Sequence, residues 1–210
     1  VRGQKITGSY TPQKAMSLGI SMVHQHFKLV PSFTVSQNIL LGHEPRKAGL
    51  FYDQAQADAL VRDLSARYSL EVNPRDLVGE LSVGLQQRVE ILKALRSGAD
   101  VLILDEPTAV LTPQETDELF AVIRRMVSER NMTVILITHK LPEVMRVSDR
   151  VGVMKRGKLV TVLDTSKTSE KEIASLMVGR EVLFDELRDE KPPGAEVLRV
   201  TDLQALSDRS

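Results

Sequence analysis

The sequence contains no cysteine and no tryptophan, and aromatic residues make up only 4% of its 210 residues. The absence of cysteine excludes disulfide bonds and thiolate metal sites, and it fits a reducing compartment. The scarcity of aromatic side chains argues against a surface that stacks nucleic-acid bases. Lys and Arg together number 28, as do Asp and Glu, so there is no net charge to attract nucleic acid or an anionic membrane.

Long apolar runs are also missing, because no segment approaches the ~20 residues that a membrane-spanning helix needs. The first ten residues, VRGQKITGSY, lack the apolar segment of a signal peptide. They also begin without Met, so we expect the sequence to start within a longer protein. With 42% apolar and 27% charged residues, the composition is typical of a soluble globular chain with about one domain.

The most informative segment is VLILDEPTAV, residues 101–110. Its unbroken apolar run predicts a strand of a parallel sheet that is buried between helices. Asp105 and Glu106 would then lie at the carboxyl end of the strand, where open α/β sheets bind ligands. One carboxylate suits Mg²⁺ and the other suits the positioning of a water molecule. The segment therefore indicates nucleoside-triphosphate hydrolysis; the alternative interpretation is a strand that ends in a solvated acidic turn.

Before this strand, the pattern predicts another strand over residues 20–24 and a mainly helical part over residues 34–98. In the helical part, Asp53 and Gln56 form a predicted capping box at the start of one helix. A second helix is expected from about Gly84 to Arg96. The residues expected on one face of the first helix are Leu60, Leu64 and Tyr68, and those aligned on the second are Leu85, Val89, Leu92 and Leu95.

After residue 101, strands and helices alternate. The segment TPQE at 112–115 is a predicted capping box with proline at the first helical position. TVILIT at 133–138 predicts a second buried strand, which ends at His139. A short helix, two strands joined by a turn at 155–157 and a helix capped by Ser169 follow. The side chains expected to face the core from the helix that follows TPQE are Leu119, Val122, Ile123 and Met126.

Four motifs in a fixed order resemble those of the ATP-binding subunits of ABC transporters. They are HQHF at 24–27, LSVGLQQRVEILKAL at 81–95, VLILDEPTAVLT at 101–112, and Ile137-Thr138-His139. They resemble the glutamine loop, the signature segment, the Walker B strand with its catalytic glutamate, and the switch histidine. The resemblance implies an α/β fold of the P-loop NTPase class, with a RecA-like core and an inserted α-helical subdomain.

The resemblance also implies the roles of individual residues. Asp105 would hold Mg²⁺, Gln25 would contact the same ion, and Glu106 would orient the water that attacks the γ-phosphate of ATP. His139 would contact that phosphate. Ser82 and Gly84 precede a helix whose N-terminus suits phosphate, and the family places them against the nucleotide of a partner cassette. A simple helix cap is the alternative interpretation of Ser82, and both can hold.

The phosphate-binding loop, G-x-x-x-x-G-K-[ST], is not found. The nearest match is GVMKRGKL at 152–159, which ends in Leu159 instead of a hydroxyl residue and lies between two predicted strands, so we interpret it as a hairpin turn. We therefore expect the first strand and the P-loop to lie upstream of this chain, and we expect the chain by itself to have little or no ATPase activity. His24 and His26 have the spacing of a metal pair, but no third ligand stands out nearby, which argues against zinc.

The expected organisation is a partial RecA-like core at 1–34 and 96–165 that encloses a helical signature subdomain at 35–95. Residues 166–195 would end the first cassette and form a linker, and 196–210 would start a second cassette.

The motifs look closest to importers of nucleosides or simple sugars with two fused cassettes. Such a protein would work at the cytoplasmic face of the membrane with permease subunits, a head-to-tail second cassette and, indirectly, a substrate-binding protein. The alternative is a non-transport ABC ATPase that acts in translation or DNA repair. The balanced charge argues against this alternative, because a nucleic-acid partner would favour a basic surface, and we expect no nucleic-acid partner.

Overall fold

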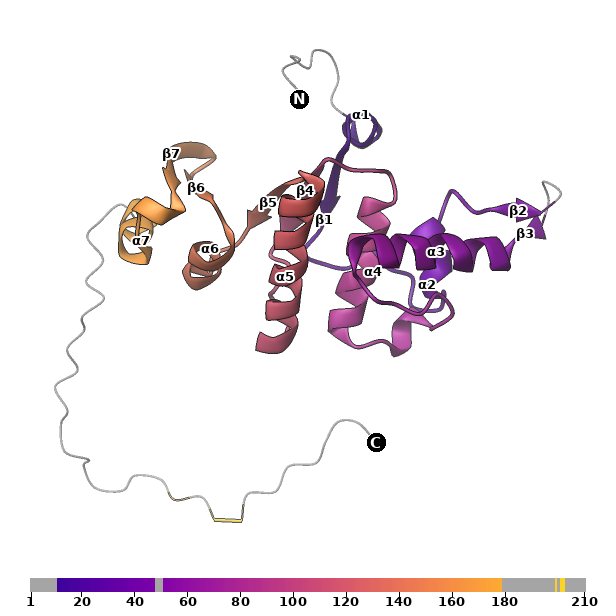
Figure 1. The fold of residues 1–210 in the computed structure, drawn as a ribbon. Helices are drawn as coiled ribbons and strands as arrows, with labels where there is room; N and C mark the ends of the chain where they lie inside the picture. Colours follow the sequence, from indigo (N-terminus) through magenta and orange to yellow (C-terminus); the bar gives the residue numbers. More distant parts are fainter. Residues whose placement is uncertain (1–10, 48–50, 179–198, 200, 203–210) are drawn as a thin grey trace.

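A three-stranded parallel sheet forms the centre of the protein in a computed structural model that describes residues 11–47, 51–178, 199 and 201–202. The strand order is β1 (Ile20–Val23), β4 (Val101–Asp105), β5 (Thr133–Ile137). Parallel pairing sets Val23 beside Leu104 and Asp105 beside Ile137. Figure 1 shows the helices of residues 35–95 on one side of this sheet, and the helices and the hairpin of residues 141–178 on the other.

The helices of the expected subdomain are α2 (Val35–Leu40), α3 (Gln54–Tyr68) and α4 (Val83–Leu95). Thr34 caps α2 in a full capping box, and the Asp53 carboxylate caps α3 by accepting from the Gln56 N–H. The short 3-10 helix η1 (Val78–Glu80) precedes α4, which packs against both α2 and β1. Contact between α4 and β1 joins the helical part to the sheet at the point where the signature segment lies.

Two features of the helical part differ from the sequence-based expectation. A small antiparallel hairpin, β2 (Arg46–Lys47) with β3 (Phe51–Tyr52), interrupts it. Leu60 was expected on the inner face of α3, but its side chain is 46% exposed. The buried face of α3 is instead formed by Ala57, Val61 and Leu64, because this set repeats at the helical spacing of three and four residues and Leu60 lies beside it.

The core gathers around β4, whose Leu102 and Leu104 are fully buried as predicted. Helix α5 (Pro113–Arg130) begins at the Thr112 capping box and buries all four expected side chains. The expectation that β5 is buried is wrong, because Ile135 is 47% exposed and Ile137 45%. These two side chains line an apolar groove of about 670 Å³, whose other walls come from residues 141–154 and from Ile173 and Met177, and no further described strand pairs with β5.

The remaining described elements form a separate group beyond β5. Helix α6 (Leu141–Val147) leads to the antiparallel hairpin of β6 (Arg150–Lys155) and β7 (Lys158–Asp164), followed by the 3-10 helix η2 (Thr165–Lys167) and α7 (Glu170–Val178). Arg156 and Gly157 both have positive φ, as a tight two-residue hairpin turn requires. The segment at 152–159 is therefore a hairpin, as predicted, and not a phosphate loop.

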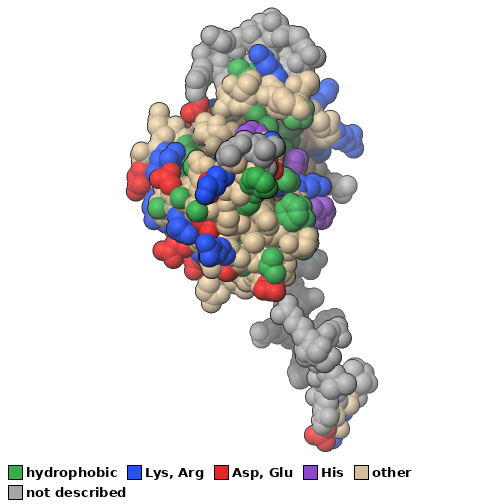
Figure 2. All heavy atoms as spheres, turned by 90° about the vertical axis from the view of Figure 1, so that its right-hand side faces the viewer, with side chains coloured by type: hydrophobic (Ala, Val, Ile, Leu, Met, Phe, Trp, Pro, Cys, Tyr) green, Lys and Arg blue, Asp and Glu red, His purple; other side chains and the backbone are tan. Residues whose placement is uncertain are grey.

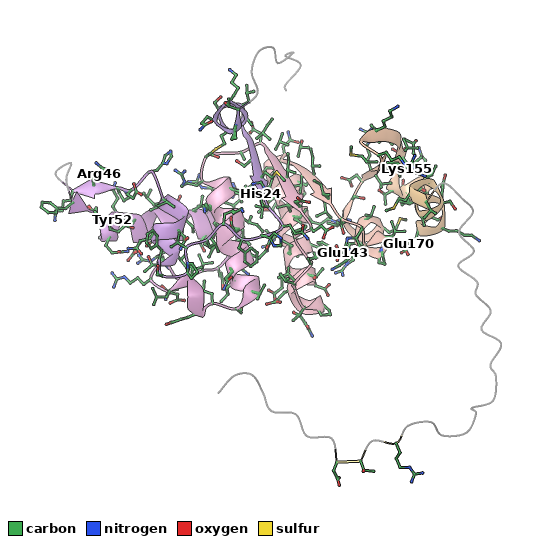
Figure 3. The ribbon with its side chains drawn as sticks, turned by 180° about the vertical axis from the view of Figure 1, so that it is seen from behind. His24, Arg46, Tyr52, Glu143, Lys155 and Glu170 are labelled. Carbon is green, nitrogen blue, oxygen red and sulfur yellow. The ribbon has the colours of Figure 1, made fainter. Side chains whose placement is uncertain are left out.

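The short helix α1 (Pro12–Ser17), which precedes β1, was not expected. Of the segment expected to end the first cassette and form a linker, residues 179–195 lie outside the described residues, as do all of 196–210 except residues 199, 201 and 202. None of the helices in the described ranges has the length and apolar character to cross a membrane. Figure 3 shows the extent of the described part, from Arg46 and Tyr52 on the small hairpin to Lys155 and Glu170 at the opposite end.

The surface at the α3 end carries charges of both signs. Figure 2 looks onto this end and shows Lys and Arg side chains interspersed with Asp and Glu, together with hydrophobic side chains. The exposed hydrophobic residues of this part include Phe51, which is 72% exposed, and Leu41 and Leu60, both 46% exposed. This mixed pattern provides no single-sign field that would attract a nucleic-acid backbone to this face.

Candidate functional site

The carboxyl ends of the three parallel strands bring the first group of expected site residues to one edge of the sheet. Gln25 follows β1, Asp105 ends β4 and Glu106 follows it, and His139 follows β5. The in-register pairing of Asp105 with Ile137 sets the turns after β4 and β5 side by side. The backbone N–H of Glu106 then donates to the Ile137 carbonyl at 2.9 Å, which extends the connection past the end of β4.

Glu106 lies at the centre of this group. One carboxylate oxygen is 3.0 Å from Nδ1 of His139, and the other accepts a hydrogen bond from Nε2 of Gln25 at 3.2 Å. The Glu106 side chain is 28% exposed and that of His139 is 68% exposed, so both can reach a ligand from solvent. Glu106 also has a φ of 45°, in the left-handed region that non-glycine residues rarely adopt. The backbone turn and two side-chain hydrogen bonds therefore fix the direction of this carboxylate.

Asp105 is available for a cation. Its carboxylate makes no hydrogen bond or ion pair within the part of the chain that the structure describes, and the residue is half-buried. No cluster of three or more His, Asp or Glu side chains that could hold a metal occurs in the same ranges. A single carboxylate still fits Mg²⁺, because this ion keeps several water ligands and is commonly held by one or two carboxylates together with substrate phosphates.

Ser82 and Gly84 lie at a second location, at the start of α4. The Ser82 hydroxyl accepts from the Leu85 N–H at 3.3 Å and so caps the helix. No hydrogen bond joins Ser82 or Gly84 to Gln25, Glu106 or His139 among the described residues. The structure therefore divides the expected site residues into a sheet-edge group and a signature group.

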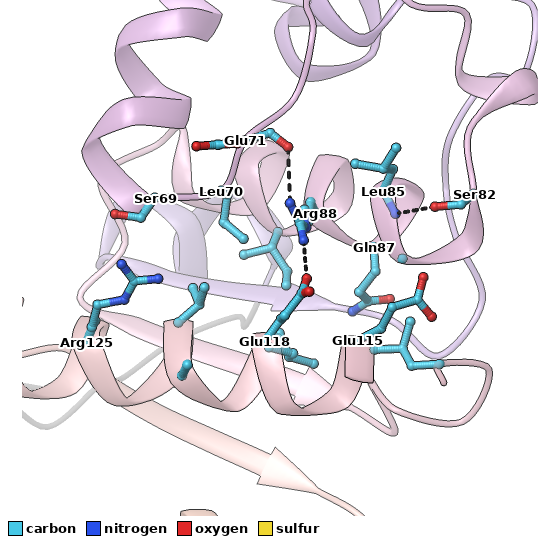
Figure 4. Close-up of a pocket in the computed structure, with 16 residues that line it drawn as sticks. Ser69, Leu70, Glu71, Ser82, Leu85, Gln87, Arg88, Glu115, Glu118 and Arg125 are labelled. Carbon is cyan, nitrogen blue, oxygen red and sulfur yellow. Dashed lines mark hydrogen bonds and ion pairs between the residues drawn. The ribbon is translucent and has the colours of Figure 1, made fainter. Parts of the chain in front are cut away.

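The signature group borders a cavity of about 510 Å³ between α4 and α5. Figure 4 shows Glu115 and Glu118 of α5 facing α4 across this cavity, with the Arg88–Glu118 ion pair spanning it. Gly84 is buried against Glu115 so closely that a Cβ atom added at Gly84 would lie 2.2 Å from the Glu115 Oε1. A side chain larger than hydrogen at position 84 therefore requires the Glu115 side chain to move.

Glu115 connects the two helices electrostatically. Hydrogen bonds from the backbone N–H of Thr112 lower the pKa of its carboxyl, and the Thr112 hydroxyl, the Gly84 N–H and the charge of Arg88 act in the same direction against partial burial. The carboxylate therefore stays charged and lies next to the N-terminus of α4. Sequence reasoning identified Glu115 only as part of a capping box; its contact with Gly84 joins segments 31 residues apart, and no local pattern could have revealed it.

Comparison with protein-family models places residues 1–109, more than half of the chain, in a family described as ABC transporter. The chain belongs to the ABC transporter family. The matched residues include HQHF at 24–27, LSVGLQQRVEILKAL at 81–95, and Asp105 and Glu106.

Curated members of the ABC family extend the likeness over nearly the whole chain. It is 50% identical to the guanosine import ATP-binding protein NupO of Bacillus subtilis, over 95% of this chain and 39% of that protein. It is 46% identical to the nucleoside import ATP-binding protein NupA of Lactococcus lactis, over 98% of this chain and 40% of that protein. The ribose import ATP-binding protein RbsA 1 of Streptomyces avermitilis is 44% identical over 91% of the chain and 36% of its own length. The chain thus spans about two fifths of these relatives.

Solved structures of ABC proteins share the fold. The dimeric ATP-binding cassette MJ0796, bound to ADP and Pi, matches with a TM-score of 0.60 at 20% identity, over 74% of this chain and 68% of that one. The cbiO1 protein of Clostridium perfringens matches with a TM-score of 0.61 at 28% identity, over 81% of this chain and 66% of that one. These matches and the parallel sheet confirm the α/β ABC ATPase fold.

Proposed function

We propose that this chain is the ATP-binding and ATP-hydrolysing part of an ABC importer. The observation that carries the proposal is the Glu106 carboxylate, which is held between Nδ1 of His139 and Nε2 of Gln25 at the edge of a parallel sheet. Phosphoryl transfer requires mainly positioning and charge stabilisation, and a carboxylate that is fixed from both sides is suited to orient a water molecule.

In this proposal Glu106 accepts a hydrogen bond from the attacking water and directs its oxygen towards the γ-phosphorus of ATP. The bond from that water oxygen to phosphorus forms as the bond from the β,γ-bridging oxygen to phosphorus breaks, giving ADP and inorganic phosphate. His139 steadies Glu106 through Nδ1, and its exposed ring is free to reach the γ-phosphate. Gln25 holds the second carboxylate oxygen and so limits rotation of the Glu106 side chain.

Asp105 and Gln25 would hold Mg²⁺, which supplies charge neutralisation at the β- and γ-phosphates when it is bound. The unpartnered, half-buried carboxylate of Asp105 supports this assignment. Ser82 and Gly84 would act on a different nucleotide, that of a second cassette arranged head to tail. Their separation from Glu106 and their position at a helix N-terminus, which favours phosphate, support that role.

The imported solute is proposed from the relatives alone. The names of three of them refer to guanosine, nucleosides and ribose, so we propose import of a nucleoside or a simple sugar. The partners would be permease subunits in the membrane, with the cassette at its cytoplasmic face and a substrate-binding protein acting through the permease. Uptake of labelled guanosine and labelled ribose by cells that carry the complete transporter would distinguish the two solute classes.

The test of the proposed chemistry is Glu106→Gln in a complete two-cassette protein that carries this sequence. The amide keeps the size of the side chain but loses the carboxylate charge, so we expect ATP to bind while turnover at this site falls by roughly 10²–10⁴-fold. His139→Ala should also lower turnover, because it removes one of the two supports of Glu106. Single-turnover hydrolysis of radiolabelled ATP, with the second cassette inactivated, measures both effects.

The matched control is Glu129→Gln on α5, an exposed glutamate whose side chain makes no hydrogen bond or ion pair in the described part of the chain. This variant should hydrolyse ATP at the wild-type rate. Wild-type turnover in Glu106→Gln would overturn the proposed role of Glu106, whereas equal losses in both variants would point to a general effect of removing charge.

A further inference from the structure

Thr108 is buried within the turn that follows Glu106, and it makes polar contacts with both Lys140 and Glu143. Thr108 is only 1% exposed. Its hydroxyl lies 2.8 Å from both carboxylate oxygens of Glu143, and its carbonyl accepts from Nζ of Lys140 at 3.0 Å. A buried threonine could satisfy its hydroxyl locally, yet this one donates to a carboxylate 35 residues away. The contact therefore joins two separate segments of the chain.

Lys140 and Glu143 complete the cluster from the other side. Nζ of Lys140 lies 3.2 Å from a Glu143 carboxylate oxygen and 3.2 Å from the Thr108 hydroxyl. The Glu143 side chain is only 12% exposed, so its charge is largely removed from water and is balanced by Lys140. Thr138 adds a backbone link, because its hydroxyl accepts from the Lys140 N–H at 3.1 Å. Figure 3 shows Glu143 beside the sheet, on the part of the chain that begins α6.

The cluster connects the two turns that present the proposed catalytic pair. Thr108 is two residues after Glu106, and Lys140 is the residue after His139. The turn after Glu106 closes with a hydrogen bond from the Ala109 N–H to the Glu106 carbonyl at 3.1 Å, so fixing Thr108 fixes the turn. Side-chain contact between Glu106 and His139 is exposed, whereas the connection through Thr108 and Glu143 is shielded from water and from competing ligands.

We propose that Thr108, Glu143 and Lys140 form a positioning unit that holds Glu106 and His139 in register for hydrolysis. The inference rests on the proposed function and deepens it. None of the three residues needs to touch the nucleotide. They set the distance between the turn after β4 and the turn after β5, and that distance determines whether the water held by Glu106 lies in line with the phosphate.

A positioning role predicts a specific kinetic signature. Thr108→Val keeps the shape of the side chain but removes the hydroxyl that donates to Glu143. Because misplacement of a reacting group by about 1 Å can cost on the order of 10²-fold in rate, we expect kcat for ATP hydrolysis to fall roughly tenfold to a hundredfold. KM for ATP should change less than about threefold, since nucleotide binding does not depend on this turn. Glu143→Gln should have the same direction of effect, and Thr108→Ser, which retains the hydroxyl, should restore most of kcat.

The experiment uses the complete two-cassette protein in its transporter, assayed at a temperature well below the unfolding transition of every variant. Thr161→Val on β7 is the matched control, because the Thr161 hydroxyl makes no hydrogen bond in the described part of the chain and the residue is far along the chain in the hairpin. It should leave kcat unchanged. Should Thr108→Val prove too unstable to assay, the comparison of Thr108→Ser and Glu143→Gln with wild type decides the question.

Two results would overturn the inference. One is a Thr108→Val protein with a lowered unfolding temperature but wild-type kcat, which would give the cluster a purely structural role. The other is a Thr108→Ser protein as slow as Thr108→Val, since the hydroxyl would then not be the determining group. In both cases the kcat of the variant is compared with that of wild type and of Glu106→Gln. If Glu106→Gln retains full turnover, the proposed function fails independently of Thr108.

Discussion

The packing of the signature segment against α5, through the contact between Gly84 and Glu115, can be tested by measuring stability without any nucleotide. Gly84 occupies the second position of α4, and its φ is not in the left-handed region, so alanine is acceptable to the backbone. The difficulty is space, because the new methyl carbon would lie 2.2 Å from Glu115 Oε1 and 2.6 Å from its Cδ. The Glu115 side chain is flexible enough to move away, but its carboxylate would then lose the capping contact with Thr112 at the N-terminus of α5.

The magnitude follows from what Glu115 does in place. Its other oxygen accepts from the Thr112 N–H at 2.9 Å and from the Thr112 hydroxyl at 3.0 Å, which closes the capping box of α5. Loss of a helix cap costs about 1 kcal/mol, whereas replacing glycine by alanine in a helix stabilises by roughly 0.5–1 kcal/mol. Alone, Gly84→Ala should therefore be neutral to destabilising by roughly 0.5 kcal/mol. In a Glu115→Ala background, where the clash is gone, it should stabilise by roughly 0.5–1 kcal/mol.

The assay is a double-mutant cycle in urea, followed by circular dichroism, on the wild-type protein, both single variants and the double variant. The coupling free energy between Gly84 and Glu115 should be on the order of 1 kcal/mol, which is within the range found for residues in contact. Additive effects, with Gly84→Ala stabilising equally in both backgrounds, would refute the close approach. Gly98→Ala is not a suitable control, because Gly98 has a φ of 72° and alanine would be strained there.

Two further predictions concern the stability of the fold. Burial raises the pKa of Asp58, but hydrogen bonds from Arg75 and Gln54 and the charge of Arg75 outweigh it and leave the pKa below its usual value. The stabilising contribution of the charged Asp58 should therefore be complete above about pH 4 and be lost as the pH falls through the lowered pKa. Asp58→Asn should cost about 2 kcal/mol at pH 7, and it should flatten the acid limb of a pH–stability curve measured by urea unfolding. An acid limb that does not change in Asp58→Asn would contradict this prediction. Leu102→Ala in fully buried β4 should cost about 3 kcal/mol, and Ile135→Ala in half-exposed β5 clearly less; equal costs would show that β5 is covered in solution.

Sequence reasoning performed well where local chemistry determines the structure. The Thr112 capping box, the proline at the start of α5 and the four buried residues of that helix all follow from short-range patterns that the structure confirms. The hairpin turn at 155–157 is similarly local, since Gly157 accepts the positive φ that the turn requires. The arrangement of Glu106 beside His139 also follows, because parallel strands end at one edge of a sheet.

It performed less well where burial depends on distant segments. The run TVILIT has the composition of a fully buried strand, but β5 lies at the edge of the described sheet and exposes Ile135 and Ile137. Leu60 is apolar and correctly spaced from Leu64, yet the position of α2 and α4 decides which face of α3 is covered. The Thr108–Glu143 contact is of the same kind, because nothing in either segment identifies its partner.

The backbone of Glu106 explains why the site depends on those distant contacts. Glu106 precedes Pro107, and a residue before proline favours extended conformations, whereas Glu106 has a φ of 45°. Such a conformation costs on the order of 1–3 kcal/mol and persists only when surrounding contacts determine it. Here the Ile137 carbonyl holds the Glu106 N–H, Gln25 and His139 hold its side chain, and Thr108 ties the following turn to α6. Removing any one contact should let the turn relax towards the extended form, which carries the carboxylate away from His139. The sensitivity of catalysis to Thr108 is therefore expected to exceed the sensitivity of folding.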